Sequence, residues 1–102
     1  MEYISVETIL NDFKESLSVL IKQYNLAEAS IYEEEGEGDT YYIGYTVLKG
    51  GKTYHIHMPF EKNDEDHLAL GKPEWTIQAE EGEYKGYESL DQVFEKINEM
   101  NE

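Results

Sequence analysis

Two alternating runs of residues flank a double glycine, and this pattern constrains the fold more than any other feature of the sequence. Residues 40–49 and 52–60 are rich in tyrosine, threonine, isoleucine and valine, which are residue types that favour β-strands. Gly50 and Gly51 lie between the two runs. Two glycines at such a position predict a tight hairpin with a two-residue turn.

The hydrophobic pattern and the turn favour the same hairpin register. If Lys49 faces Lys52, every opposed pair on one side of the hairpin is apolar or aromatic. These pairs are Val47 with Tyr54, Tyr45 with Ile56, Ile43 with Met58, and Tyr41 with Phe60. The other side then holds Leu48 with Thr53, Thr46 with His55, Gly44 with His57, and Tyr42 with Pro59. A slip of one residue would mix the two sets, so the sequence predicts this register.

Two segments have the apolar period of an amphipathic helix. Residues 5–24 place apolar side chains at steps of three and four, with Ser5 at the N-cap and Asn25 at the end. The last segment begins at Ser89, and Gln92 follows three residues later, as in a capping box. We therefore expect one helix at each end of the chain.

Two more strands are expected, at residues 28–34 and 74–79. The residues between the elements read as acidic or glycine-containing turns and loops (35–39, 61–67 and 80–86), with a short extension at 68–70. The element order α-β-β-β-β-α, without a repeat or a long linker, predicts a single α+β domain over residues 1–102. The expected architecture is a four-stranded antiparallel meander with two helices packed on one face, leaving the second face to water or a partner.

The net charge restricts the possible partners. The chain has 23 acidic and 8 basic residues, which gives a charge of −15, and every base is a lysine. Nucleic acids and anionic membranes bind proteins through basic side chains, so we expect no nucleic acid and no membrane as a partner. The acidity serves either solubility in a salt-rich cytoplasm or the docking of a basic partner.

Cysteine is absent, which excludes disulfides, thiolate metal sites and cysteine nucleophiles. The start of the sequence, Met1 to Ser5, lacks the basic and apolar regions of a secretory signal. No apolar run approaches the ~20 residues that span a bilayer. The expected location is the cytoplasm.

Catalytic motifs are also missing from the sequence. It contains no G-x-S-x-G, G-x-x-x-x-G-K or H-E-x-x-H pattern, and no G-x-G-x-x-G after a strand. Carboxylates are so frequent that no pair stands out as a general acid and base. The sequence therefore indicates no catalytic residue and no cofactor, and a non-enzymatic role is expected.

His55 and His57 are the candidate metal ligands. Residues i and i+2 of a strand point to the same side, so the two imidazoles would be able to share an ion. His67, Asp64 or Asp66 would add a ligand if their loop folded back. No spacing fixes that third ligand, and two surface histidines without a metal are the alternative.

Four residues of the second sheet face form a candidate partner surface: Tyr42, Thr46, His55 and His57. Tyrosine combines a large contact area with a hydrogen-bonding tip, so this face suits a protein partner or a homodimer. The alternative is an ordinary half-polar outer face.

Three stretches of the sequence carry a resemblance to a known group of proteins. They are Tyr-Tyr-Ile-Gly-Tyr-Thr-Val at 41–47, His-Ile-His-Met-Pro-Phe at 55–60 and Glu-Trp-Thr-Ile at 74–77. By these stretches the chain resembles the small acidic uncharacterised proteins of bacilli and their relatives. The resemblance implies a bacterial cytosolic protein from a family without an assigned activity, and it assigns a role to no residue.

Three functional hypotheses follow from the sequence. The first is a non-enzymatic interaction or regulatory module that meets a protein partner through its acidic surface or open sheet face. The second is a small-ligand or metal-binding protein that uses His55 and His57. The third is a nucleic-acid mimic whose carboxylates are spaced like phosphates.

Overall fold

The computed structural model describes residues 3–71 and 73–101, and it confirms the α+β class. The first two residues of the predicted non-secretory start lie outside the described part. In chain order the elements are β1 (Ile4–Ser5), α1 (Val6–Tyr24), β2 (Glu28–Glu35), β3 (Thr40–Lys49), β4 (Lys52–Lys62), β5 (His67–Leu70), β6 (Trp75–Ala79), β7 (Gly82–Tyr87) and α2 (Leu90–Met100).

Both predicted helices are present, with the predicted caps. The Ser5 hydroxyl accepts a hydrogen bond from the Thr8 amide at 3.2 Å, and Asn25 ends α1 in the left-handed conformation with φ of 54°. The Ser89 hydroxyl accepts from the Gln92 amide at 3.2 Å at the start of α2. These bonds satisfy amide groups that the first turn of a helix leaves unpaired.

The β3–β4 hairpin has the predicted register along its whole length. Lys49 faces Lys52, Ile43 faces Met58 and Tyr41 faces Phe60, with the intermediate pairs in step. Gly50 and Gly51 adopt φ values of 60° and 79°, as a primed two-residue turn requires.

The predicted four-stranded meander with two helices packed on one face is wrong. The sheet has seven strands in the order β1-β5-β4-β3-β2, and β6 and β7 branch from β4. The first part of β4 pairs with β6 from His55 to His57, and its last part pairs with β5 from Phe60 to Lys62. The meander fails because β4 is long enough to hold two different neighbours along the same side.

The sequence prediction missed two short strands, β1 and β7. β7 lies in the segment that was expected to be an acidic turn. Its two tyrosines, Tyr84 and Tyr87, are three residues apart and show no alternation, because an irregularity in the pairing with β6 lies between them. β1 has only two residues, and it pairs with β5 through Ile4 and Leu68. Such short strands form by tertiary pairing and have no periodicity of their own.

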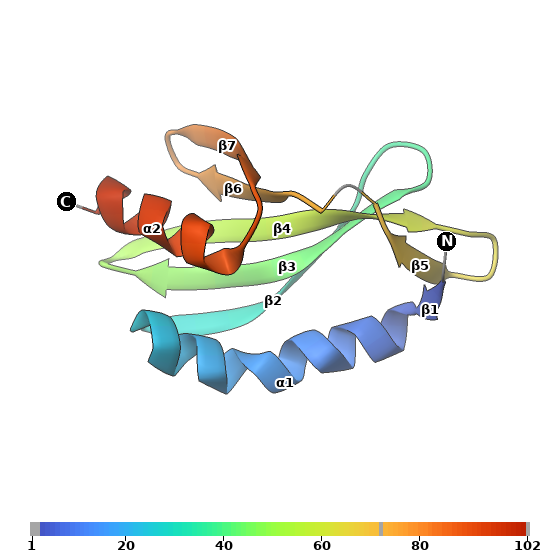
Figure 1. The fold of residues 1–102 in the computed structure, drawn as a ribbon, viewed down its shortest axis with the longest axis horizontal. Helices are drawn as coiled ribbons and strands as arrows, with labels where there is room; N and C mark the ends of the chain where they lie inside the picture. Colours follow the sequence, from blue (N-terminus) through green and yellow to red (C-terminus); the bar gives the residue numbers. More distant parts are fainter. Residues whose placement is uncertain (1–2, 72, 102) are drawn as a thin grey trace.

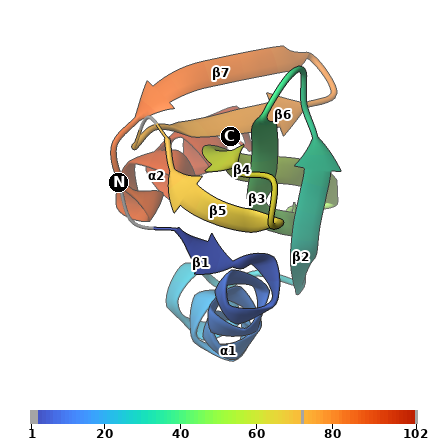
Figure 2. The same ribbon diagram turned by 90° about the vertical axis from the view of Figure 1, so that its right-hand side faces the viewer.

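The two helices lie over different parts of the sheet. α1 runs along β2, whereas α2 contacts β6 and β7 (Figure 1). The view along the sheet shows how strongly the strands twist between β2 and β7 (Figure 2). The helices meet where Tyr24 stacks on Phe94 with 4.0 Å between ring centroids, and the Tyr24 hydroxyl donates to Asp91 at 2.6 Å.

The main core joins both helices to one side of the β3–β4 hairpin. Its fully buried members are the apolar hairpin side chains together with residues of β6 and α2. They are Val47, Tyr54, Ile56, Ile77, Val93, Phe94 and Ile97. A smaller cluster of Ile9, Ile43, Phe60 and Leu68 extends this core toward β5.

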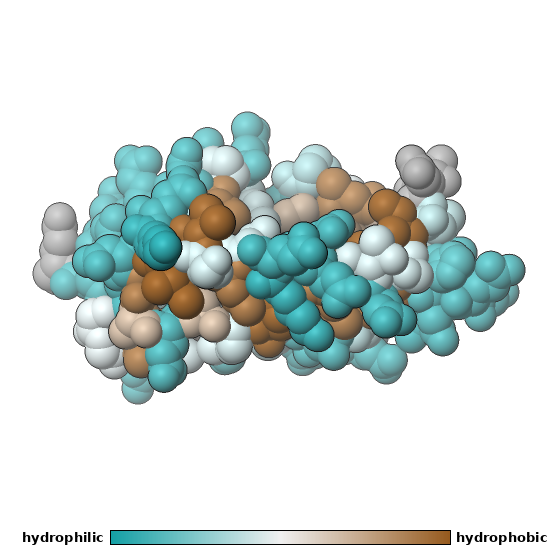
Figure 3. Space-filling view, turned by 90° about the horizontal axis from the view of Figure 1, so that it is seen from below, coloured by the Kyte–Doolittle hydropathy of each residue, from teal (hydrophilic) through white to brown (hydrophobic). Residues whose placement is uncertain are grey.

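On the α1 side, the described surface mixes hydrophobic and hydrophilic side chains (Figure 3). In the view from below, hydrophilic side chains cross and interrupt the hydrophobic ones (Figure 3). Val19, at 58% exposure, is the most exposed large apolar residue in the described part of the chain. Scattered apolar side chains of this kind are normal on a protein surface.

Gly44 marks the closest approach of β3 to β4, and we predict that Gly44→Ala destabilises the fold. A Cβ atom there would overlap the carbonyl oxygen of Ile56 and lie 2.6 Å from Cα of His57. Because both obstacles are backbone atoms, urea unfolding should show a loss of ~2–3 kcal/mol. Gly36→Ala is the control: its nearest obstacle is the Tyr42 ring, which is able to move. Equal losses in the two variants would contradict the prediction.

Candidate functional site

The second face of the hairpin carries a cluster of aromatic and histidine side chains, which we call the outer face. It comprises the predicted residues Tyr42, Thr46, His55 and His57 together with Tyr32, Thr76, Gln78 and Glu83, which share this side through strand pairing.

Tyr32 of β2 lies at the centre of the outer face. It is paired with Gly44 of β3, and its ring reaches across β3 to the histidines of β4. Its centroid lies 4.9 Å from that of His55 and 5.4 Å from that of His57. Tyr42 approaches His57 from another direction, at 4.9 Å and an interplanar angle of 60°.

The two histidines have different environments although they are only two residues apart. Nδ1 of His55 lies 2.8 Å from the hydroxyl of its cross-strand partner, Thr46. His57 is paired with Gly44, which offers no hydroxyl, and its buried Nδ1 has no hydrogen-bond partner. The residue is only 6% exposed. Burial lowers the pKa of His57 below its ordinary value of 6.5, although nearby Glu83 and Glu34 oppose the shift.

A hollow of about 230 Å³ opens beside His57. Its lining includes Tyr42, Thr76 and Gln78, and carboxylates of Glu34, Glu35 and Glu83 surround it. Lys85 also lines the hollow, and its ammonium group is 3.8 Å from the Glu83 carboxylate. Carboxylates therefore outnumber the basic groups around the hollow.

Tyr32 links the aromatic cluster of the outer face to the carboxylates around the hollow. Its hydroxyl donates a hydrogen bond to the Glu34 carboxylate and lies 3.3 Å from Oε1 of Gln78. Burial and the bond to Glu34 raise the pKa of Tyr32 to about 12. The ring is therefore a neutral hydrogen-bond donor at physiological pH.

The structure brings the four predicted partner-surface residues together but does not expose them equally. Tyr42, Thr46 and His55 are half-buried, whereas His57 is buried beneath the neighbouring rings. Sequence reasoning missed Tyr32. The hairpin sequence holds no signal for it, because its place over the histidines follows from the register of β2 against β3.

The residues predicted as metal ligands do not form a metal site among themselves. No group of three or more histidine, aspartate or glutamate side chains in the described ranges is arranged to hold an ion. His67 begins β5, which pairs with the opposite end of β4 from His55. The third ligand that a metal would need is therefore not supplied from that loop.

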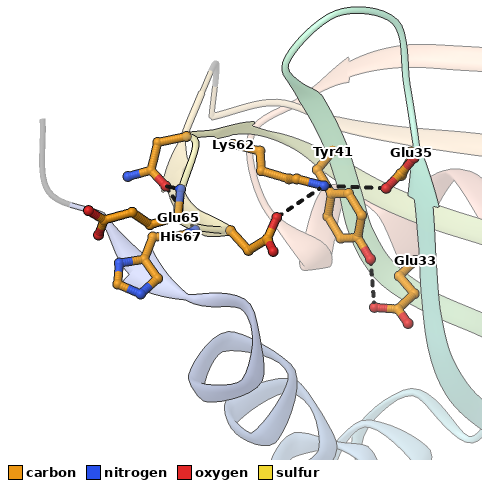
Figure 4. Close-up of polar contacts among 8 residues, drawn as sticks. Glu33, Glu35, Tyr41, Lys62, Glu65 and His67 are labelled. Atoms are coloured by element: carbon orange, nitrogen blue, oxygen red, sulfur yellow. Dashed lines mark hydrogen bonds and ion pairs between the residues drawn. The ribbon is translucent and has the colours of Figure 1, made fainter.

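A second polar cluster surrounds Lys62 at the other end of β4 (Figure 4). The ammonium group of Lys62 lies 3.3 Å from Glu35 and 3.5 Å from Asp66. The Tyr41 hydroxyl donates to Glu33 at 2.9 Å. These contacts tie the loop after β4 to the end of β2, and the lysine occupies the position that a cation would otherwise take.

Comparison with known proteins identifies the family. A model described as "Family of unknown function (DUF5634)" matches residues 3–97, which is nearly the whole chain. The chain belongs to this family. Membership confirms the resemblance to an uncharacterised family and adds no activity. No curated protein matches the chain.

No helix in the described part of the structure is both long and apolar enough to cross a membrane. α1 has 19 residues, but its polar side carries several charged side chains.

The burial of His57 generates a prediction about pH. Since its pKa is below 6.5 in the folded protein, the unfolded chain binds a proton more readily. The free energy of unfolding should therefore fall as the pH is lowered through 6.5. An NMR titration of the imidazole should give a pKa below 6.5, and His57→Gln should lose this part of the pH dependence. A pKa at or above 6.5 in the folded protein would contradict the prediction.

Proposed function

We propose that this protein is a non-enzymatic interaction module that binds a basic protein partner on its outer face. The observation that carries the proposal is the combination of half-buried tyrosine rings with a border of carboxylates. Tyr32 and Tyr42 supply the rings, and Glu34, Glu35 and Glu83 supply the border. The two hollows of this face, one beside His57 and one beside His55, are lined by residues of the strands and of the loops that join them.

The chemistry of the outer face favours a cationic partner. An ammonium or guanidinium group gains from contact with a tyrosine ring and from the surrounding carboxylates. Tyrosine is also enriched at protein interfaces, where its ring supplies contact area and its hydroxyl supplies specificity. A second copy of this chain is a poor occupant, because each copy carries a net charge of −15.

The alternatives have weaker support. The metal hypothesis lacks a third ligand, as described above. A nucleic-acid mimic needs a row of carboxylates, but here acidic residues are distributed over α1, β2, the loops, β7 and α2. The absence of cysteine fits a reducing compartment, and we place the module in the bacterial cytoplasm.

Binding of hexalysine, measured by calorimetry in 0.15 M salt, tests the proposal. The double variant Glu34→Gln, Glu83→Gln should bind about fivefold more weakly than the wild type, as expected for two exposed ion pairs of ~0.5 kcal/mol each. Glutamine at position 34 still accepts a hydrogen bond from Tyr32, so the fold should be retained.

The matched control is Glu15→Gln, Glu95→Gln, which removes the same charge from the exposed surfaces of α1 and α2. This control should bind like the wild type. Equal weakening in both double variants would mean that hexalysine responds only to net charge, and the outer-face proposal would be wrong.

A further inference from the structure

Strand β2 is the long open edge of the sheet. It has eight residues, and each of them is paired with a residue of β3 in one unbroken register. Within residues 3–71 and 73–101, no strand pairs with its other side. An edge of this kind presents a row of unpaired backbone groups.

The pairing pattern tells which backbone groups of β2 face outward. The Gly36 amide donates to the Thr40 carbonyl at 2.9 Å, so even-numbered residues of this strand direct their amide and carbonyl groups to β3. The pairing of β3 with β4 agrees with this assignment. The Lys62 amide donates to the Asp39 carbonyl at 2.7 Å, so odd-numbered residues of β3 direct their backbone groups to β4 and even-numbered ones direct them to β2. Residues 29, 31, 33 and 35 therefore direct their backbone groups away from the sheet.

The other edges of the sheet are protected against strand addition. β1 has only two residues. The register between β6 and β7 is shifted between Trp75 and Ile77, and Gly86 in β7 has a φ of 93°. Bulges and short strands prevent pairing with a further strand. β2 has neither of these features.

The charges on β2 decide which strand would pair with it. Four of its eight residues are glutamates, at positions 28, 33, 34 and 35, and none is basic. Two copies of β2 side by side would bring two such sets together, and like charges on neighbouring strands are destabilising. A strand that carries lysine or arginine would place opposite charges beside these glutamates, which is stabilising.

We propose that the β2 edge receives an extended basic segment of the partner protein as an additional strand. This inference rests on the function proposed above and adds how the partner binds. The partner's backbone would pair with residues 29–35, as in other cases of strand addition. Alternate basic side chains would then reach Glu34 on the outer face, and their neighbours would reach Glu33 and Glu35 on the opposite face.

Glu33→Pro tests this inference directly. Proline removes the outward-facing amide of residue 33, and the hydrogen bonds to β3 remain because they come from even-numbered residues. The matched variant Glu33→Gln loses the same charge but keeps the amide. Tyr41→Phe provides a second control, since it removes only the hydrogen bond between Tyr41 and Glu33.

The probe is a blocked eight-residue peptide that alternates lysine and threonine, with its affinity measured by calorimetry. We expect Glu33→Pro to bind at least tenfold more weakly than Glu33→Gln, while Tyr41→Phe binds like the wild type. Equal affinities of Glu33→Pro and Glu33→Gln would overturn strand addition. The outer-face proposal would still stand, because the variants at Glu34 and Glu83 test it separately.

Peptides methylated on the backbone nitrogen provide a test that does not depend on the stability of the proline variant. In an added strand, alternate residues direct their amides to β2 and the others direct them away. Methylating one alternate set should abolish binding to the wild-type protein, and methylating the other set should leave binding within threefold. If both methylated peptides bind alike, the segment does not bind as a strand.

Discussion

The close contact between β3 and β4 is the constraint on which the rest of the structure depends. Along this hairpin one alternating set of residues, which includes Ile43, Val47 and Ile56, points to the core, and the other set points to the outer face. Gly44 allows the backbones to approach closely at the middle of the hairpin. The absent side chain leaves room for the β4 backbone and leaves His57 without a cross-strand hydroxyl. The core and the candidate site therefore have a common origin in one pair of strands.

Local sequence signals predicted the parts of the fold that are determined locally. The hairpin register followed from alternation and turn chemistry together, and the helix caps followed from Ser5 and Ser89. β5 was expected only as a short extension at 68–70, and β1 and β7 were missed, because β1 pairs with a strand distant in sequence and β7 pairs around a bulge. The branching of β4 is likewise a tertiary property, because its sequence reads only as one long strand.

The candidate site could be predicted only in part for a related reason. Alternation placed Tyr42, Thr46, His55 and His57 on one face, and the structure brings them together there. The alternation did not predict that His57 would be buried. The ring that lies against His57 belongs to Tyr32 of β2, and the register of β2 against β3 leaves no signal in the hairpin sequence. The outer face is therefore a surface of tyrosine rings bordered by carboxylates, and one of its two histidines is buried.

The branching of β4 also divides the sheet into two partly independent halves. β6 pairs with β4 only as far as His57 and β5 begins at Phe60, so Met58 and Pro59 lie between the two neighbours. Pro59 has no amide hydrogen to offer on that side, and its carbonyl accepts from the Gly71 amide at 3.1 Å. Because neither β5 nor β6 is paired with β4 at Pro59, the missing amide hydrogen of the proline removes no hydrogen bond from the sheet. Local opening of the small β1–β5 end would leave the β6–β7 pairing and α2 in place. One end of the sheet is therefore able to unfold while the other end keeps its structure.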